Sequence, residues 1–287
     1  MSIQIGTPDI IRDRKFLKIL YKDLLVQKTD FFQNIQYGMH FLRRRQEHAL
    51  ISPGEETRWL AALLADRVTY VPAANKVVVP EYLLAPPLFH PRYAPQVNLG
   101  GLGVMIAEAV VEAVAGTGLV FTANGQILDG QAVAKAGRAA NLTSIASRAA
   151  AAIEPSAVLQ GPAACLLTKW AAMGLDTPDQ LAKAAVGGAV AVGGLEAAYT
   201  ALTESLLVEG GQLLPALERL DPQSVFFVQY AQTFCAVSTL AQRDLDRTLG
   251  RDLLGREKLK GVLSQFAEFR HFFFCSERNE DMCGPVL

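Results

Sequence analysis

The sequence predicts a mainly α-helical fold with one small edge β-sheet, an α+β class. Two observations support this prediction. Apolar residues recur at helical spacing over most of the chain, and β-branched runs gather in one short segment near Pro72. With 51% hydrophobic and 19% charged residues, the chain has the composition of a globular protein with a large core. Its 287 residues are enough for one large domain or two small ones.

The first helical region begins near Asp13 and continues to about Leu64. Its apolar positions include Phe16, Leu20 and Leu24, followed by Phe32, Ile35, Met39 and Leu42. The sequence ISPGEE, at residues 51–56, breaks the pattern, and its glutamates suit the first turn of a new helix. We therefore expect at least two helices before the β segment.

The β segment has β-branched runs on both sides of Pro72–Asn75. This arrangement predicts a short hairpin around that turn. Because proline cannot donate a ladder hydrogen bond, we place the hairpin at the edge of its sheet.

A glycine-led helix follows, with the sequence NLGGLGVMIAEAVVEAV at residues 98–114. Glu108 and Glu112 are four residues apart and therefore share one face of this helix. Two carboxylates hold a hard cation only weakly unless further oxygen ligands join them. Taken locally, the segment is more typical of an amphipathic helix with one polar stripe.

The second half of the chain is predicted to be helical after a loop at residues 121–130, which has turn residues at Asn124–Gly125. Glycine pairs at 187–188 and 193–194 could divide the longest of these helices in two. The expected helices are Gln131–Ile153, Ala163–Met173, Thr177–Leu207, Asp221–Ala241 and Ser264–Phe274.

Several classes of function are disfavoured by what the sequence lacks. A net charge of −1 gives no reason to expect a nucleic-acid partner. The N-terminal segment meets charges too early for a signal peptide, and Glu108 and Glu112 interrupt the best candidate for a membrane span. There is no P-loop, no nucleophile elbow and no dinucleotide fingerprint. The four histidines are scattered, without the i, i+4 pair of a zinc helix: His40, His48, His90 and His271.

The cysteines and one sequon leave the compartment open at this point. No CxxC spacing is present, which disfavours a zinc knuckle or a thioredoxin-like site. Asn141 begins an N-glycosylation sequon, NLT, which matters only in the secretory pathway.

Four longer segments carry a pattern that is specific as an ordered set. They are VVVPEYLLAPPLFHPRYAPQVNLGGLGVMIAEAVVEAV (77–114), VGGAVAVGGLEAAYTAL (186–202), DPQSVFFVQYAQTFC (221–235) and LKGVLSQFAEFRHFFFC (259–275). Their order and spacing resemble the neprilysin and endothelin-converting enzyme family of zinc metallopeptidases, and the likeness extends to IGTPD near the start. The resemblance implies the thermolysin-like zincin half of the neprilysin fold. It also implies one domain over residues 1–287, with about the first 30 residues derived from the family's helical cap.

The resemblance places substitutions at every position that carries the family's chemistry. Glu108 and Glu112 stand at the two zinc-ligating histidines of the HExxH motif, and Ala109 stands at its general base. Gly187 stands at the third zinc ligand, and Ala191 at the aspartate that orients a second-shell histidine. Zinc peptidases need these groups to hold the ion and to activate water.

Substrate-binding positions are changed as well. Arg67 and Val68 match the pair that clamps the substrate on the edge strand. Asp252 and Lys258 match a histidine and an arginine of a later motif.

We therefore expect an inactive member of this family, without zinc, that acts by binding a peptide or a protein. The alternative is an active zinc metalloendopeptidase that uses Glu108, Glu112 and a carboxylate from elsewhere. A third interpretation is a truncated chain that folds poorly on its own.

The resemblance also bears on the compartment. It implies a disulfide between Cys165 and Cys283, and it matches Cys235 and Cys275 to cysteines that pair with a region this chain lacks. Family members are membrane-anchored or secreted ectoproteins. We therefore expect an extracellular or lumenal location, glycosylation at Asn141, and a chain that is the C-terminal part or an isoform of a longer protein.

Overall fold

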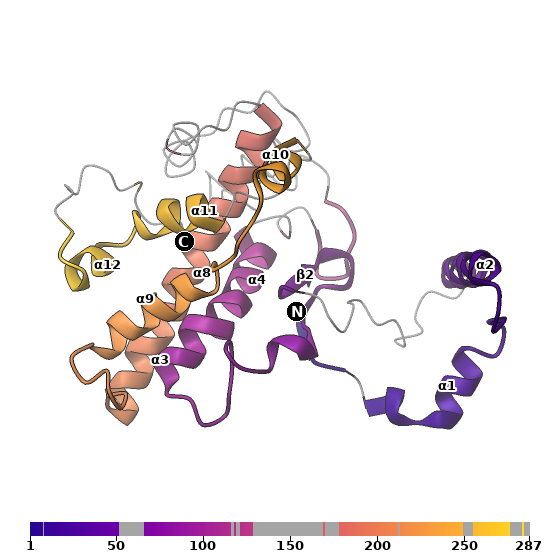
Figure 1. Cartoon of the computed structure of the whole chain (residues 1–287), viewed down its shortest axis with the longest axis horizontal. Coiled ribbons are helices and arrows are strands. Elements are labelled where there is room, and N and C mark those ends of the chain that lie inside the picture. Colours follow the sequence, from indigo (N-terminus) through magenta and orange to yellow (C-terminus); the bar gives the residue numbers. More distant parts are fainter. Residues whose placement is uncertain are drawn as a thin grey trace.

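The computed structural model describes residues 1–7, 9–51, 66–115, 118, 121–128, 169, 178–211, 213–248, 255–275 and 283. Within these ranges the chain is mostly helical and has one three-stranded sheet (Figure 1). The predicted fold class is therefore confirmed.

The sheet has the strand order β1-β3-β2, formed by β1 (Ser2–Ile5), β2 (Thr69–Val71) and β3 (Lys76–Val79). The hairpin prediction is confirmed, because β2 and β3 pair in antiparallel fashion across the short 3-10 helix η2 (Pro72–Ala74). The prediction that the whole hairpin lies at an edge is wrong, since β3 also pairs in parallel with β1. Prolines flank β3 without interrupting it, so both of its sides can accept a neighbour.

The glycine-led helix is confirmed and forms the centre of the structure. It begins with α3 (Pro95–Asn98), continues through a π-helical turn, η4 (Leu99–Gly103), and ends as α4 (Val104–Ala115). A short 3-10 helix, η3 (Glu81–Leu83), precedes it.

A single helix, α8 (Pro178–Glu209), covers the long predicted segment, so the suggested division at the glycine pairs is wrong. Gly194 lies where α8 packs against α4, in direct backbone contact with that helix. Close packing therefore accounts for glycine here, rather than a chain break.

Two of the four described C-terminal helices, the first and the last, are shorter than predicted, and the other two were not predicted. The four are α9 (Pro222–Gln232), α10 (Leu240–Thr248), α11 (Gly255–Leu263) and α12 (Ala267–Phe272). The predicted helix Asp221–Ala241 ends early, where the Thr233 hydroxyl donates to the Tyr230 carbonyl at 2.7 Å. The predicted helix Ser264–Phe274 begins late, because the Ser264 hydroxyl caps the end of α11 by donating to the Gly261 carbonyl at 2.8 Å. Side-chain bonds of this kind compete with helix continuation.

Two apolar clusters lie on opposite sides of α4. Val104 and Val111 of α4 join α8, α9 and α11 in the larger cluster, which includes Leu195, Phe226 and Val262. Leu102 and Ala109 face the sheet instead, in a cluster with Val68, Val77, Val79 and Leu83. Helix α4 is thus the layer between the sheet and the helical bundle.

The N-terminal helices lie away from this body (Figure 1). They are the 3-10 helix η1 (Asp9–Arg12), α1 (Arg14–Leu20) and α2 (Phe31–Ile51). They confirm the helical spacing expected from Asp13 onward, but the break between Leu20 and Phe31 was not predicted. One face of α2 is apolar and exposed, at Phe31, Phe32, Ile35, Met39 and Leu42. Residues 52–65 and the predicted helices at 131–153 and 163–173, Lys169 excepted, are outside the described residues.

One described helical stretch, Pro95–Val114, is long and apolar enough to span a membrane by length and composition alone, with a mean hydropathy of 1.6. The expectation that glutamates rule out every such stretch was therefore too strict. Its two sides contribute to both apolar clusters, and the core helix of a soluble protein passes the same test.

Candidate functional site

Glu108 lies at the meeting point of four helices. It projects from α4 on the side of the helical bundle, where its backbone is so close to α8 that a Cβ on Gly194 would lie 2.7 Å from the Glu108 nitrogen. Its carboxylate faces Lys258 of α11, and its charge is felt by Tyr230 of α9. The sequence-predicted position is therefore an interior site and not a solvated helix face.

The contact between Glu108 and Lys258 is an ion pair. Lys258 Nζ donates to Glu108 Oε2 at 3.1 Å, and each side chain is only 23% exposed. The same ammonium lies 5.8 Å from the ring centroid of Phe234, within the range of a cation–π interaction. The pair thus links α11 to α4 in a setting where water screens it less than at the surface.

Tyr230 closes the bundle side of this site. It is 2% exposed, and its ring packs edge-on against Phe234 with centroids 5.0 Å apart. Burial, and after it the negative charge of Glu108, raises the pKa of its hydroxyl well above 10. The phenol is therefore neutral, and its oxygen has no hydrogen-bond partner among the described residues.

Sequence reasoning did not single out Tyr230 or Phe234. The available signal was the four-residue spacing of Phe226, Tyr230 and Phe234, which places the first two rings on one side of α9 and the third just beyond its end.

Ala109 faces away from the ion pair. It is 5% exposed and packs in the sheet-side cluster with Val68 and Val77. A methyl group in an apolar cluster offers no group that could accept a proton from water. Glu112 is partly buried one turn beyond Glu108 on the same side of α4.

Gly187 and Ala191 lie on α8, seven and three residues before Gly194. The helical repeat places all three on about the same stripe of α8, which meets α4 at Gly194. A Cβ on Gly187 would meet nothing within 4 Å, whereas Ala191 is fully buried in the larger core. Neither residue carries a side-chain donor for a metal or for a histidine.

These residues do not fit a catalytic zinc ion. Such sites use three protein ligands and keep a fourth position open. The part of the chain that the structure describes contains no group of three histidine, cysteine, aspartate or glutamate side chains placed to hold a metal. An ion bound to the Glu108 carboxylate at about 2 Å would also lie within about 5 Å of the Lys258 ammonium, a repulsion of several kcal/mol at an effective dielectric constant of about 20.

The glycines that lead into α4 have a packing role. A Cβ on Gly100 would lie 2.5 Å from the Phe226 carbonyl oxygen, and one on Gly101 would lie 2.4 Å from that of Leu88. Gln229 secures the same junction by donating from Nε2 to the Pro87 carbonyl at 3.1 Å. Close backbone approach therefore explains this motif without any ligand.

The remaining predicted site residues are dispersed. Val68 is buried under the sheet, while Arg67 is exposed beside Asp66, with its Nε 3.7 Å from the Asp66 carboxylate. Cys283 is buried and disulfide-bonded, and Cys235 and Cys275 are free and exposed. Three predicted residues lie outside the described part of the chain: Asn141, Cys165 and Asp252. The pairing of Cys165 with Cys283 thus stays a prediction.

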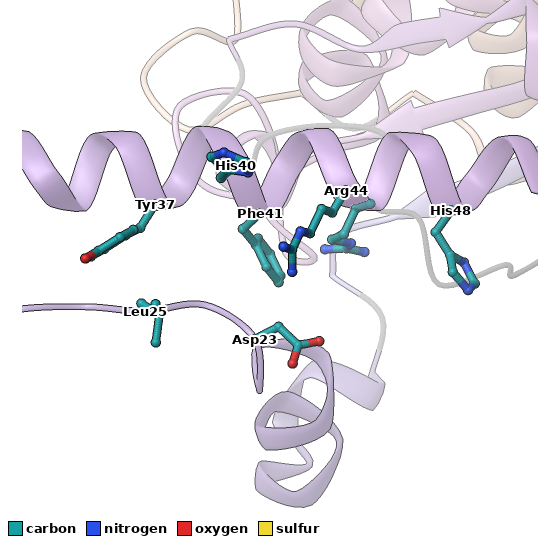
Figure 2. Close-up of a pocket in the computed structure, with 8 residues that line it drawn as sticks. Asp23, Leu25, Tyr37, His40, Phe41, Arg44 and His48 are labelled. Atoms are coloured by element: carbon teal, nitrogen blue, oxygen red, sulfur yellow. The ribbon is translucent and has the colours of Figure 1, made fainter.

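A pocket of about 430 Å³ occurs elsewhere, between α2 and the segment after α1 (Figure 2). Tyr21 stacks on Phe41 beside it, with ring centroids 5.8 Å apart, and Arg45 lies 5.7 Å from the centre of the Phe41 ring. Its lining residues are Asp23, Leu25, Tyr37, His40, Phe41, Arg44, Arg45 and His48. It is remote from α4 and shares no residue with the Glu108 site (Figure 1).

Comparison with known proteins identifies related sequences over most of the chain. The model of the family described as peptidase family M13 matches residues 68–283. Neprilysin-1 of Caenorhabditis elegans is 26% identical over 285 residues, covering 96% of this chain and 35% of the relative. Human neprilysin is 22% identical over 284 residues with the same coverage. The chain therefore spans about a third of the length of these relatives.

The fold has a close counterpart among solved structures. The Mycobacterium tuberculosis zinc metalloprotease ZMP1, in complex with an inhibitor, superposes with a TM-score of 0.75 at 19% identity. The match covers 100% of this chain and 41% of that protein. The predicted zincin half of the neprilysin fold is confirmed by this likeness.

Proposed function

Because the chain belongs to peptidase family M13, we propose that it is a non-catalytic member that binds a peptide or protein partner without cleaving it. The observation that carries this proposal is Ala109. It stands at the position of the family's general base and is buried among apolar side chains facing the sheet.

Hydrolysis of a peptide bond by a zincin requires two coupled functions. A metal must polarise the carbonyl and lower the pKa of a water molecule, and a carboxylate must take the proton of that water. The carboxylate next to the base position in the sequence is Glu108, and its Oε2 already accepts a hydrogen bond from Lys258. This carboxylate is held by Lys258 on the bundle side of α4, whereas Ala109 faces the sheet.

The charge of the site also changes what it could bind. From the sequence alone, Glu108 and Glu112 would give this face of α4 the character of an acidic floor. Lys258 offsets the charge of Glu108, so the floor is less acidic than the sequence suggests. A partner would therefore be held by shape and apolar contact more than by a cationic group.

The competing candidate is an active zinc metalloendopeptidase with Glu108 and Glu112 as ligands. The relatives named neprilysin favour it on family grounds, and carboxylates are known zinc ligands. It requires Lys258 to leave Glu108 and a third ligand to come from outside the described residues. We rank it second for that reason.

We further propose that the domain acts outside the cell or in the secretory pathway, with a glycan at Asn141 and a disulfide between Cys165 and Cys283. The family relationship to neprilysin supports this location. Treatment of the expressed protein with a glycosidase, with Asn141→Gln as the control, tests the glycan directly by a change in gel mobility.

Two measurements test the proposed function. The purified chain is incubated with a library of fluorogenic peptides in the presence of zinc, with human neprilysin as the positive control. We expect no cleavage above background, and we expect some peptides to be retained intact by the immobilised chain. Zinc-dependent cleavage that disappears on addition of a chelator would overturn the proposal.

A further inference from the structure

We propose that the Lys258 ammonium takes the place of a bound metal ion in this domain, as a built-in cation that neutralises Glu108, links α11 to α4 and keeps divalent ions out. This inference deepens the proposed loss of catalysis and rests on it. It assigns the exclusion of metal to one side chain.

The geometry places the cation on the carboxylate that stands at the first metal-ligand position. Lys258 Nζ is 3.1 Å from Glu108 Oε2, and both side chains are mostly buried. The Phe234 ring provides a second favourable contact at 5.8 Å from the ammonium. A carboxylate on one side and a π face on the other define a site for one monovalent cation.

The position of Lys258 is fixed by the helix that carries it. Val262, one turn further along α11, is fully buried in the helical core, and Leu263 beside it is buried as well. Residues four apart share a helix face, so Lys258 is directed toward the same interior. The ammonium can leave Glu108 only by losing both contacts or by moving α11 off the core.

A divalent ion and this ammonium cannot share the Glu108 carboxylate. Both would be drawn to the same negative charge, and they would repel each other across a short distance in a poorly screened site. Tyr230 offers no second negative charge to relieve this conflict, because its buried hydroxyl is neutral. Removing the ammonium, in contrast, leaves a mostly buried carboxylate without this cation, one turn from Glu112.

The test compares zinc and cobalt affinity, by isothermal titration calorimetry, for the intact chain and three variants. Lys258→Met removes the cation. Lys260→Met, at an exposed position two residues away on α11, is the matched control. The double variant Glu108→Gln with Lys258→Met removes the carboxylate as well.

We expect Lys258→Met to bind either ion about tenfold or more tightly than the intact chain. Lys260→Met should bind the ions with the same affinity as the intact chain. The double variant should lose the higher affinity of Lys258→Met. Equal affinity of Lys258→Met and the intact chain would overturn the inference. If Lys258→Met lacks a cooperative thermal transition, Lys258→Gln replaces it with the same expectation. Peptidase activity of the intact chain would instead defeat the proposed function, so the two failures are distinguishable.

Discussion

Glu108 and Lys258 are 150 residues apart in the sequence, yet they form a partly buried ion pair with 3.1 Å between Oε2 and Nζ. The pair joins α4 to α11, the helix at residues 255–263. The contribution of the pair to stability, the packing around it and the metal content of the domain can each be measured.

The strength of the pair can be measured with a double-mutant cycle of Glu108→Gln and Lys258→Met. Because both side chains are mostly buried, each single change should lower the free energy of unfolding by about 1–3 kcal/mol, with a coupling of about 1 kcal/mol or more. Urea denaturation gives these values. The exposed pair Arg43–Glu47 on α2 is the matched control, and its coupling should be at most about 0.5 kcal/mol. Equal coupling in the two cycles would contradict the packing described here.

The contact between α4 and α8 predicts opposite outcomes for two glycines of one helix. Gly194→Ala should lower the free energy of unfolding by about 1–3 kcal/mol, because its Cβ would press on the Glu108 backbone, which cannot move aside. Gly187→Ala should raise it by about 0.5–1 kcal/mol, since its Cβ meets nothing and alanine favours a helix. Thermal unfolding of both variants shows whether Gly194→Ala lowers the stability while Gly187→Ala raises it. Two shifts of the same sign would show that α8 packs differently.

The unsatisfied hydroxyl of Tyr230 predicts that its removal is harmless. Tyr230→Phe should leave the free energy of unfolding unchanged or raise it by about 1 kcal/mol, because a buried polar group without a partner is itself destabilising. Tyr70→Phe is the control. There the hydroxyl donates to Asn75 Oδ1 at 3.1 Å, and the loss should be about 0.5–1.5 kcal/mol. A clear destabilisation by Tyr230→Phe would instead reveal a partner for this hydroxyl.

Glu196 on α8 predicts a pH-dependent change in stability. Burial, and after it the charge of Glu268, raises the pKa of its carboxyl above the ordinary value of 4.5. As pH rises from 4.5 toward the higher pKa of the folded state, the unfolded chain loses its proton first, so the stability of the fold decreases. Glu196→Gln removes that loss and should be more stable than the intact chain at pH 7, with no such gain below pH 4.5.

Thermal unfolding at pH 4 and at pH 7 checks this prediction for Glu196. Glu268→Gln should also raise the stability at pH 7, but by less than Glu196→Gln does. It removes only the charge of Glu268 and leaves the effect of burial on the pKa of Glu196 in place. If Glu196→Gln and the intact chain differ in stability by the same amount at pH 4 and at pH 7, titration of Glu196 does not cause the difference.

Local patterns predicted much of the fold. The hairpin around Pro72 and the helix after Asn98 follow from β-branched runs and helical spacing, and both are present. The strand β1 was missed because its four residues are too few to show a period. The continuity of α8 was uncertain for another reason: a glycine pair is a break signal in isolation, and only the nearby backbone of α4 explains it.

The sequence assigns candidate site positions one by one and does not give their arrangement in space. The ordered motifs placed Glu108, Ala109 and Lys258 at changed positions of the family's chemistry. No local pattern could show that two of these residues meet, because the contact depends on how α11 docks on the helical core. Nor could it show that Ala109 faces the sheet while its neighbour Glu108 faces the bundle, a difference set by the two-sided burial of α4.

The central claim is that this domain holds no catalytic zinc, and the metal content of the purified chain tests it most directly. The chain is expressed with zinc in the medium and measured by inductively coupled plasma mass spectrometry, with human neprilysin prepared in parallel. We expect zinc far below one ion per chain. One tightly held ion per chain, retained through dialysis, would contradict it.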